Sequence, residues 1–101
     1  MSHEITPGSL THRQLEARAA RGDHAAAFDL GLIWSSGSGG FAMNLVEAHK
    51  WFNLAALWGN DEAAAWRHEV ADEMTAREVI DAQREARAVL LAMQPVLRQA
   101  A

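Results

Sequence analysis

The chain has 101 residues and a formal net charge of −4, a length typical of one domain. The absence of cysteine excludes a disulfide framework and a thiolate metal site, and the lack of a basic patch argues against binding to nucleic-acid phosphates. Alanine contributes 21 residues and β-branched residues are not clustered, a composition that favours helices over sheet.

Residues 1–10 are expected to be flexible, and the first helix is predicted to begin at Thr11. Thr11 and Gln14 have the spacing of a capping box, in which the two side chains bond to backbone N–H groups of the first turn. Gly22 follows the helical stretch, and glycine is common just after a helix. The first helix is therefore predicted to end before Gly22.

The second helix is predicted over about 23–35, with Asp23 as its N-cap. Its apolar residues recur at helical spacing; they are Ala26, Leu30, Ile33 and Trp34. Gly31 lies inside this helix although glycine costs about 1 kcal/mol there relative to alanine. We expect Gly31 to be a packing notch, where the missing side chain lets a neighbouring helix approach closely.

The segment 35–40, Ser-Ser-Gly-Ser-Gly-Gly, is predicted to be a loop that reverses the chain. A glycine-rich loop can also hold a phosphate. However, a P-loop requires Gly-Lys-Ser/Thr at the start of a helix, and a dinucleotide site requires a preceding strand. The sequence has neither feature, so a turn is the favoured interpretation.

The third helix is predicted over about 44–58. Asn44 and Glu47 have the spacing of an N-cap and a capping-box glutamate, and Gly59 is expected to end the helix. Its inward stripe is predicted to comprise Leu45, Ala48, Phe52 and Ala55, with Trp51 and Trp58 on the flank.

The fourth helix is predicted over about 61–73, with Asn60 or Asp61 as its N-cap. Its inward stripe is expected to comprise Ala63, Trp66, Val70 and Met74. His68 and Asp72 are four residues apart in this helix. We interpret them as an exposed polar pair, because the further ligands of a metal site are missing.

The fifth helix is predicted over about 75–94, because Thr75 and Glu78 form another capping box. Apolar residues then hold one helical face for about five turns. Pro95 is expected to end or kink the helix, which leaves residues 95–101 as a C-terminal tail.

The sequence also contains a repeat. Gly22 is followed four residues later by Ala26, and Gly59 four residues later by Ala63, which gives a period of 37. Self-similarity at such a period is typical of stacked helix pairs. The stretch between the two glycines resembles the Sel-1-like repeat, a short relative of the tetratricopeptide repeat. The matching residues are Ala26, Leu30-Gly31, Trp34, Gly37-Ser38-Gly39, Asn44, Ala48, Trp51-Phe52, Ala55-Ala56 and Gly59.

The resemblance implies an all-α domain over 11–94, built of antiparallel helix-hairpin repeats in a tetratricopeptide-like α–α superhelix. One full repeat covers about 23–59, with a partial repeat on either side and a capping helix over about 75–94. It implies an adaptor that binds a protein partner, without catalytic residues and without a cofactor. The partner itself is not identified by the resemblance.

Large aromatic residues are the candidate partner-binding residues, since exposed aromatics are enriched at binding hot spots. Trp34 and Trp51 occupy positions that build the hairpin core in the resembling family, so we interpret both as structural. Phe28, Trp58 and Trp66 are the candidates for contact with a partner. Core packing is the alternative for each of them, because large apolar side chains dominate small cores.

No residue set predicts an enzyme or a metal site. The five histidines are scattered and no two of them lie four residues apart, as a zinc helix requires; they are His3, His12, His24, His49 and His68. The adjacent acids Asp61-Glu62 and Asp72-Glu73 are interpreted as exposed helix surface, and no nucleophile elbow is present.

Two alternatives to partner capture remain. So short an array leaves open helix faces, which a homodimer would cover. The other alternative is a small-molecule-binding or catalytic domain, and its basis is a pocket rimmed by Trp34, His49 and Trp58. The first ten residues lack the regions of a secretory signal, and no apolar run approaches the roughly 20 residues that cross a bilayer. We therefore expect a cytoplasmic protein that does not bind a membrane.

Overall fold

The computed structural model describes residues 5–37 and 39–100. Within these residues it contains five α-helices and no strand, which confirms the predicted all-α class. The helices are α1 (Leu10–Ala19), α2 (His24–Ser36), α3 (Leu45–Leu57), α4 (Ala63–Ala71) and α5 (Ala76–Ala100).

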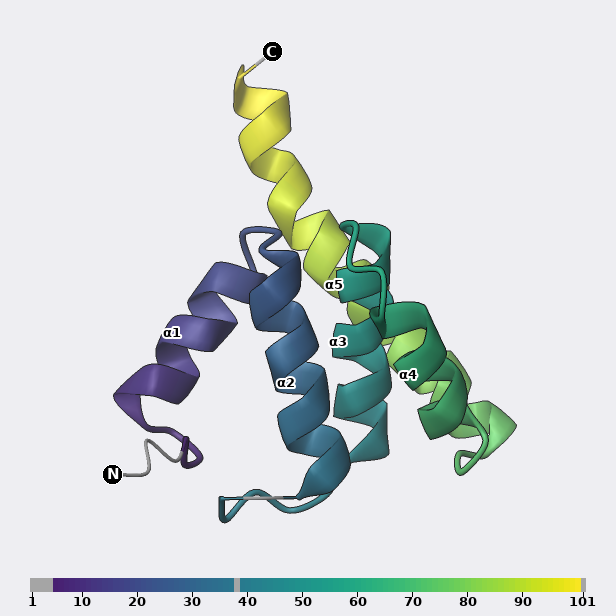
Figure 1. The fold of residues 1–101 in the computed structure, drawn as a ribbon. Coiled ribbons are helices and arrows are strands. Elements are labelled where there is room, and N and C mark those ends of the chain that lie inside the picture. The colour runs from purple at the N-terminus through teal and green to yellow at the C-terminus, as the bar shows by residue number, and fades with distance from the viewer. Residues whose placement is uncertain (1–4, 38, 101) are drawn as a thin grey trace.

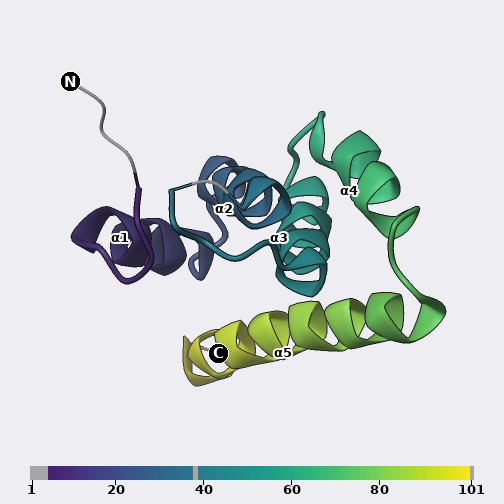
Figure 2. The same cartoon turned by 90° about the horizontal axis from the view of Figure 1, so that it is seen from below.

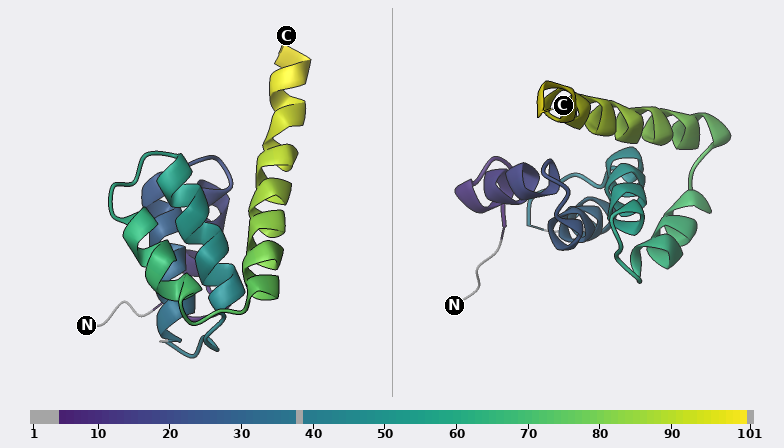
Figure 3. Two further views of the ribbon diagram at one scale, coloured as in Figure 1. Left: turned by 90° about the vertical axis from the view of Figure 1, so that its right-hand side faces the viewer. Right: turned by 90° about the horizontal axis from the view of Figure 1, so that it is seen from above.

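The helices alternate in direction along the chain (Figure 1). Seen from below, α1 to α4 lie next to one another in a curved row, and α5 crosses one side of that row (Figure 2). The C-terminal part of α5 extends beyond the other helices (Figure 3). The central helix is α3, which packs on α2, α4 and α5 and therefore separates an α2 side from an α5 side.

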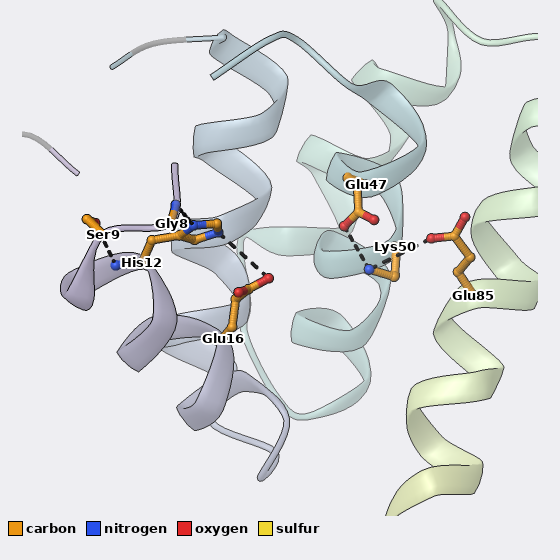
Figure 4. A network of polar contacts seen from close by, with 7 residues as sticks. All are labelled: Gly8, Ser9, His12, Glu16, Glu47, Lys50 and Glu85. Atoms are coloured by element: carbon orange, nitrogen blue, oxygen red, sulfur yellow. Dashed lines mark hydrogen bonds and ion pairs between the residues drawn. The ribbon is translucent and has the colours of Figure 1, made fainter. Parts of the chain in front are cut away.

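The first helix begins at Leu10, and its N-cap is Ser9 rather than Thr11. The Ser9 Oγ accepts a hydrogen bond from the His12 N–H at 3.1 Å. The His12 Nδ1 accepts from the Gly8 N–H at 2.9 Å, which holds the turn before the helix (Figure 4). The prediction of Thr11 was wrong because Ser9 has the same capping chemistry, and the anchored His12 places the first turn around it.

The α1–α2 and α3–α4 turns use the same hydrogen-bond pattern. Gly22 and Gly59 have φ values of 93° and 106°, a left-handed region that glycine adopts without a steric penalty. Each glycine is followed by a residue whose N–H donates back to a carbonyl five positions earlier, a pattern common at helix C-termini. The bonds are Asp23 N–H to Arg18 C=O at 3.1 Å and Asn60 N–H to Ala55 C=O at 2.9 Å. The two predicted helix ends are confirmed.

The residue that follows each glycine, Asp23 or Asn60, also caps the next helix. The Asp23 carboxylate accepts hydrogen bonds from the N–H groups of Ala25 and Ala26. The Asn60 amide oxygen accepts from those of Glu62 and Ala63, each at 3.0 Å. Of the two predicted caps for α4, Asn60 therefore forms the hydrogen bonds, and regular helix begins two residues later than expected, at Ala63.

The glycine-rich loop is shorter than predicted. Ser35 and Ser36 belong to α2, and Gly37 is the C-cap, with its N–H donating to the Ile33 carbonyl at 3.1 Å. Ser38 lies outside the described residues. The chain reverses before α3, whose N-cap is Asn44, as predicted. The helix end moves because serine is tolerated in a last turn, whereas Gly37 takes the left-handed conformation that stops it.

Gly31 is the packing notch that the sequence predicts. A Cβ atom at this position would lie 2.5 Å from Cδ1 and 2.9 Å from Cγ of the Phe52 ring. Phe52 is fully buried, so its ring has little room to move away. The missing side chain at Gly31 is therefore what allows α2 and α3 to pack this closely.

The core consists of two clusters of buried residues. The larger one joins all five described helices and contains Leu15, Leu30, Trp51 and Leu54 together with six alanines. The smaller one comprises Ala48, Phe52 and Val70. Alanine predominates because small side chains let the helix axes approach one another, as the composition suggests.

A charged side chain links α5 to α3. The Lys50 Nζ lies 2.7 Å from a Glu47 oxygen and 3.8 Å from a Glu85 oxygen on α5 (Figure 4). It also lies 4.7 Å from the centre of the Trp51 ring, a favourable cation–π distance. The Glu47 carboxylate is thus used for Lys50, while the Asn44 N–H donates to the Trp34 carbonyl at 2.9 Å. The predicted capping box at α3 therefore has only its Asn44 half.

The last helix starts as predicted but extends further. The Thr75 N–H donates to a Glu78 carboxylate oxygen at 2.9 Å and the Glu78 N–H donates to the Thr75 hydroxyl at 3.1 Å. The helix then runs through Pro95 to Ala100, so the expectation that Pro95 ends it was wrong. Proline removes one hydrogen-bond donor, but its fixed φ is helical, and helix-forming residues lie on both sides.

Candidate functional site

Two of the three predicted partner-binding residues meet on one surface. Phe28 of α2, Phe52 of α3 and Trp66 of α4 form a triangle in which each ring contacts the other two. The ring centres are 5.7 Å apart for Phe28 and Phe52, and 6.4 Å apart for Phe28 and Trp66. The Phe52 and Trp66 rings are stacked, with centres 6.0 Å apart and an interplanar angle of 26°. We call Phe28, Phe52 and Trp66 the aromatic surface.

Exposure within the aromatic surface is graded. Phe52 is buried, Phe28 is half-buried and Trp66 keeps 39% of its surface exposed. Further half-buried apolar residues pack on the same small core cluster; they are Leu32, Trp34, Leu45 and Met74. The exposed tryptophan therefore belongs to a wider apolar region over α2, α3 and α4.

Trp58 lies elsewhere. It follows α3 as its C-cap and is half-buried against the larger core cluster. A Cβ atom at Gly22 would contact both Trp58 and Met93 of α5, so the indole lies beside the α1–α2 turn and α5. Trp58 packs into the core, which is the alternative interpretation that the sequence left open, and it is not part of the aromatic surface.

The two tryptophans predicted to be structural contribute to packing. Trp51 is 5% exposed and belongs to the larger cluster. Trp34 is half-buried and makes edge-to-face contacts with His12 and Phe41, at centre distances of 6.2 and 5.0 Å. The sequence did not predict His12 or Phe41 as packing residues, because their contacts join α1 to the loop after α2 and depend on tertiary structure.

The sequence left open a pocket rimmed by Trp34, His49 and Trp58, but among the described residues neither tryptophan lines the cleft that contains His49. This cleft measures about 320 Å³ and lies between α3, α4 and α5, while the two tryptophans pack elsewhere. Five other residues line this cleft; they are Asn53, Arg67, His68, Ala71 and Gln83. The sequence missed them because they come from three helices: two of the six lining residues lie on α3, three on α4 and one on α5.

The cleft is polar and positively charged. The Arg67 guanidinium donates a hydrogen bond to the Asn53 amide oxygen at 2.7 Å. His49 is only 4% exposed, and its Nδ1 has no hydrogen-bond partner among the described residues. Burial lowers the pKa of His49 below its ordinary value of 6.5, and the Arg67 charge lowers it further. A neutral imidazole is thus held beside a guanidinium.

Two further kinds of feature, a metal site and a membrane-spanning helix, lack support in the described part of the chain. It contains no group of three or more His, Asp or Glu side chains able to hold a metal ion. His68 and Asp72 are both exposed. None of the helices that the structure describes is long and apolar enough to cross a membrane.

Comparison with known proteins found no matching family model, curated protein or solved structure.

Proposed function

We propose that the protein is an interaction module built from Sel-1-like antiparallel helix hairpins, and that it binds another protein through the aromatic surface. The occupant we infer is an apolar anchor side chain, presented by a helix or loop of the partner. The exposed, stacked indole of Trp66 is the observation that carries this proposal.

The repeat part of the proposal is supported by the two turns. The hydrogen bonds around Asn60 are those around Asp23 shifted by 37 positions, in the bond to the preceding carbonyl and in both cap bonds. This is the period seen in the sequence. Together with the alternating helix directions (Figure 1), it favours two successive hairpins with the same local design.

The binding part is supported by the chemistry of the surface. Tryptophan combines a large apolar area with a rigid ring, and it is enriched where binding energy is concentrated. Trp66 already stacks on the buried Phe52, so its ring is held in place before a partner arrives. A preorganised side chain loses less entropy on binding.

Site-specific photo-crosslinking in cells tests this proposal. A photoreactive phenylalanine analogue replaces Trp66 in one variant and Leu91 in a matched control. Leu91 is also exposed, at 54%, but lies on α5. We expect an adduct of defined mass at position 66 and none at position 91, with the partner identified by mass spectrometry. Circular dichroism checks that both variants remain helical.

Three results contradict the proposal. One is the absence of any adduct at position 66. Another is the same set of adducts at both positions, which indicates non-specific contact. The third is an adduct of only about twice the 11.0 kDa mass of the chain, which indicates the alternative of self-association.

A further inference from the structure

A second cleft adjoins the one around His49. It measures about 370 Å³, lies between α3 and α5, and shares Asn53 and Gln83 with the first. Its other lining residues are mainly apolar; they are Leu54, Leu57, Ala86, Arg87 and Leu90. The two clefts form one continuous depression along α3 and α5, which we call the α3–α5 groove.

Polarity changes along the floor of the groove. His49, Asn53 and Leu57 are spaced four residues apart on α3, so they lie on one helical face. The first two are polar, whereas Leu57 is apolar and 63% exposed. One end of the groove therefore offers only polar groups and Ala71, whereas the other adds the exposed hydrocarbon of Leu57 beside Arg87.

The polar end is complementary to an anion. Arg67 has five N–H donors, and one of its terminal nitrogens donates to the Asn53 amide oxygen. His49 adds a buried imidazole with an unpartnered nitrogen, and His68 and Gln83 add further polar groups. No carboxylate lines either cleft, so this end has positive charge and donors without an anionic partner.

The apolar end favours a hydrocarbon. Leu57 and Leu90 face the same cleft from α3 and α5, and covering their exposed apolar area with a hydrocarbon chain is favourable. Leu57 lies eight positions after His49, which corresponds to about 12 Å of helix and matches an extended acyl chain of about eight to ten carbons.

We propose that the α3–α5 groove binds a medium-chain carboxylic acid. Its carboxylate lies at Arg67 and His49, and its hydrocarbon chain extends along Leu57 and Leu90. This site is distinct from the aromatic surface, because it involves α5 and a different side of α3. It assigns a ligand class to a part of the molecule that partner binding does not use.

Isothermal titration calorimetry on the full chain tests the ligand class. Octanoate supplies the head and the tail, acetate supplies only the head, and octanol supplies a tail without charge. We expect saturable one-site binding of octanoate, and affinities for acetate and octanol that are each at least about tenfold weaker, since each lacks one half of the recognition. Equal binding of octanol and octanoate overturns the proposal, as does the absence of octanoate binding.

Variants test the position of the carboxylate. Arg67→Gln removes the charge at the polar end, and we expect octanoate affinity to fall about tenfold or more, the usual effect of losing a charged hydrogen bond. Arg77→Gln is the matched control, since Arg77 is exposed and pairs with Asp81 outside the groove. Arg67→Lys retains the charge and is expected to recover part of the affinity.

Arg87→Gln distinguishes the two ends of the groove, because Arg87 lines the apolar end. An octanoate affinity that depends on Arg87 but not on Arg67 overturns the assignment of the head. NMR provides an independent readout: the His49 imidazole resonances are expected to shift with octanoate in the native chain and in Arg77→Gln. A shift of the same size in Arg67→Gln contradicts the proposal.

Discussion

The pair α3–α4 has two sides with opposite chemistry. Toward α2, the Phe52 ring stacks with Trp66 and lies against Gly31. Toward α5, the next residue of each helix, Asn53 and Arg67, forms a 2.7 Å hydrogen bond at the edge of a polar cleft. Successive residues differ by about 100° around a helix axis, so one helix pair carries both sides.

The difference shows which physical property controls each side. On the aromatic side the free energy of unfolding depends on side-chain volume, because the Phe52 ring fills a close-packed space that has no room for another atom. On the polar side it depends on charge and hydrogen bonding, because a buried imidazole and a guanidinium share a small space. Substitutions on the two sides should therefore respond to different variables.

The largest effect is expected on the aromatic side. Gly31→Ala places a methyl group against the buried Phe52 ring, and overpacking of this kind costs about 1–3 kcal/mol. The free energy of unfolding is measured by urea denaturation. In a Phe52→Leu background the smaller, more flexible side chain leaves room, so the cost of Gly31→Ala should shrink. An equal cost in both backgrounds contradicts the proposed contact.

An intermediate effect on stability is expected in the α3–α4 turn, which joins the two helices of this pair. Asn60→Ala removes the oxygen that accepts from two N–H groups, and loss of such a cap costs about 1 kcal/mol. Asn60→Asp retains an acceptor and should remain near native stability. The loss should be the same at pH 5 and pH 7.5, since asparagine does not titrate; a loss confined to one pH would contradict this explanation.

The smallest effect is expected on the polar side, and it depends on pH. Burial lowers the pKa of His49 in the folded state below its ordinary value of 6.5, and the Arg67 charge makes a smaller contribution in the same direction. As pH falls below 6.5, the unfolded chain binds this proton before the folded chain does, so the free energy of unfolding decreases. Above 6.5 both states are neutral and the contribution vanishes.

His49→Gln removes this titration. Denaturation curves between pH 7.5 and pH 5 should show a steeper loss of stability for the native chain than for His49→Gln. Arg67→Gln should give an intermediate slope, because it removes one of the two causes of the lowered His49 pKa. Around His49, the cleft is also lined by His68, which can titrate, and by Gln83 of α5, which is neutral. Identical slopes for the native chain and His49→Gln would show that burial of His49 does not disfavour its charged form.

Local sequence signals predicted several helix ends. Gly22 and Gly59 marked the ends of α1 and α3, and the start of α5 had both halves of a capping box. Two agreeing signals were not always enough, because Thr11 and Gln14 have capping-box spacing and the N-cap of α1 is nevertheless Ser9. Thr11 and Ser9 competed for one cap, and Pro95 was outweighed by the helix formers around it, because local preferences of about 1 kcal/mol are easily reversed by their surroundings.

The candidate sites depended more strongly on tertiary structure. Phe28, Trp58 and Trp66 were equivalent in the sequence as large aromatic residues in helices. Packing distinguished them: Trp58 lies against the α1–α2 turn and α5, whereas Phe28 and Trp66 contact each other and Phe52. The polar cleft was missed, since its residues come from three helices with wide sequence separation.

The sequence by itself determined the all-α class, the positions of the two glycine turns and the notch at Gly31. These features depend on backbone conformation and side-chain size, which are properties of single residues and their near neighbours. Only the tertiary structure decided which tryptophan stays exposed and which residues share the groove along α3 and α5. The rotation and separation of packed helices set those contacts, and they arise from the sum of many small packing energies across the chain.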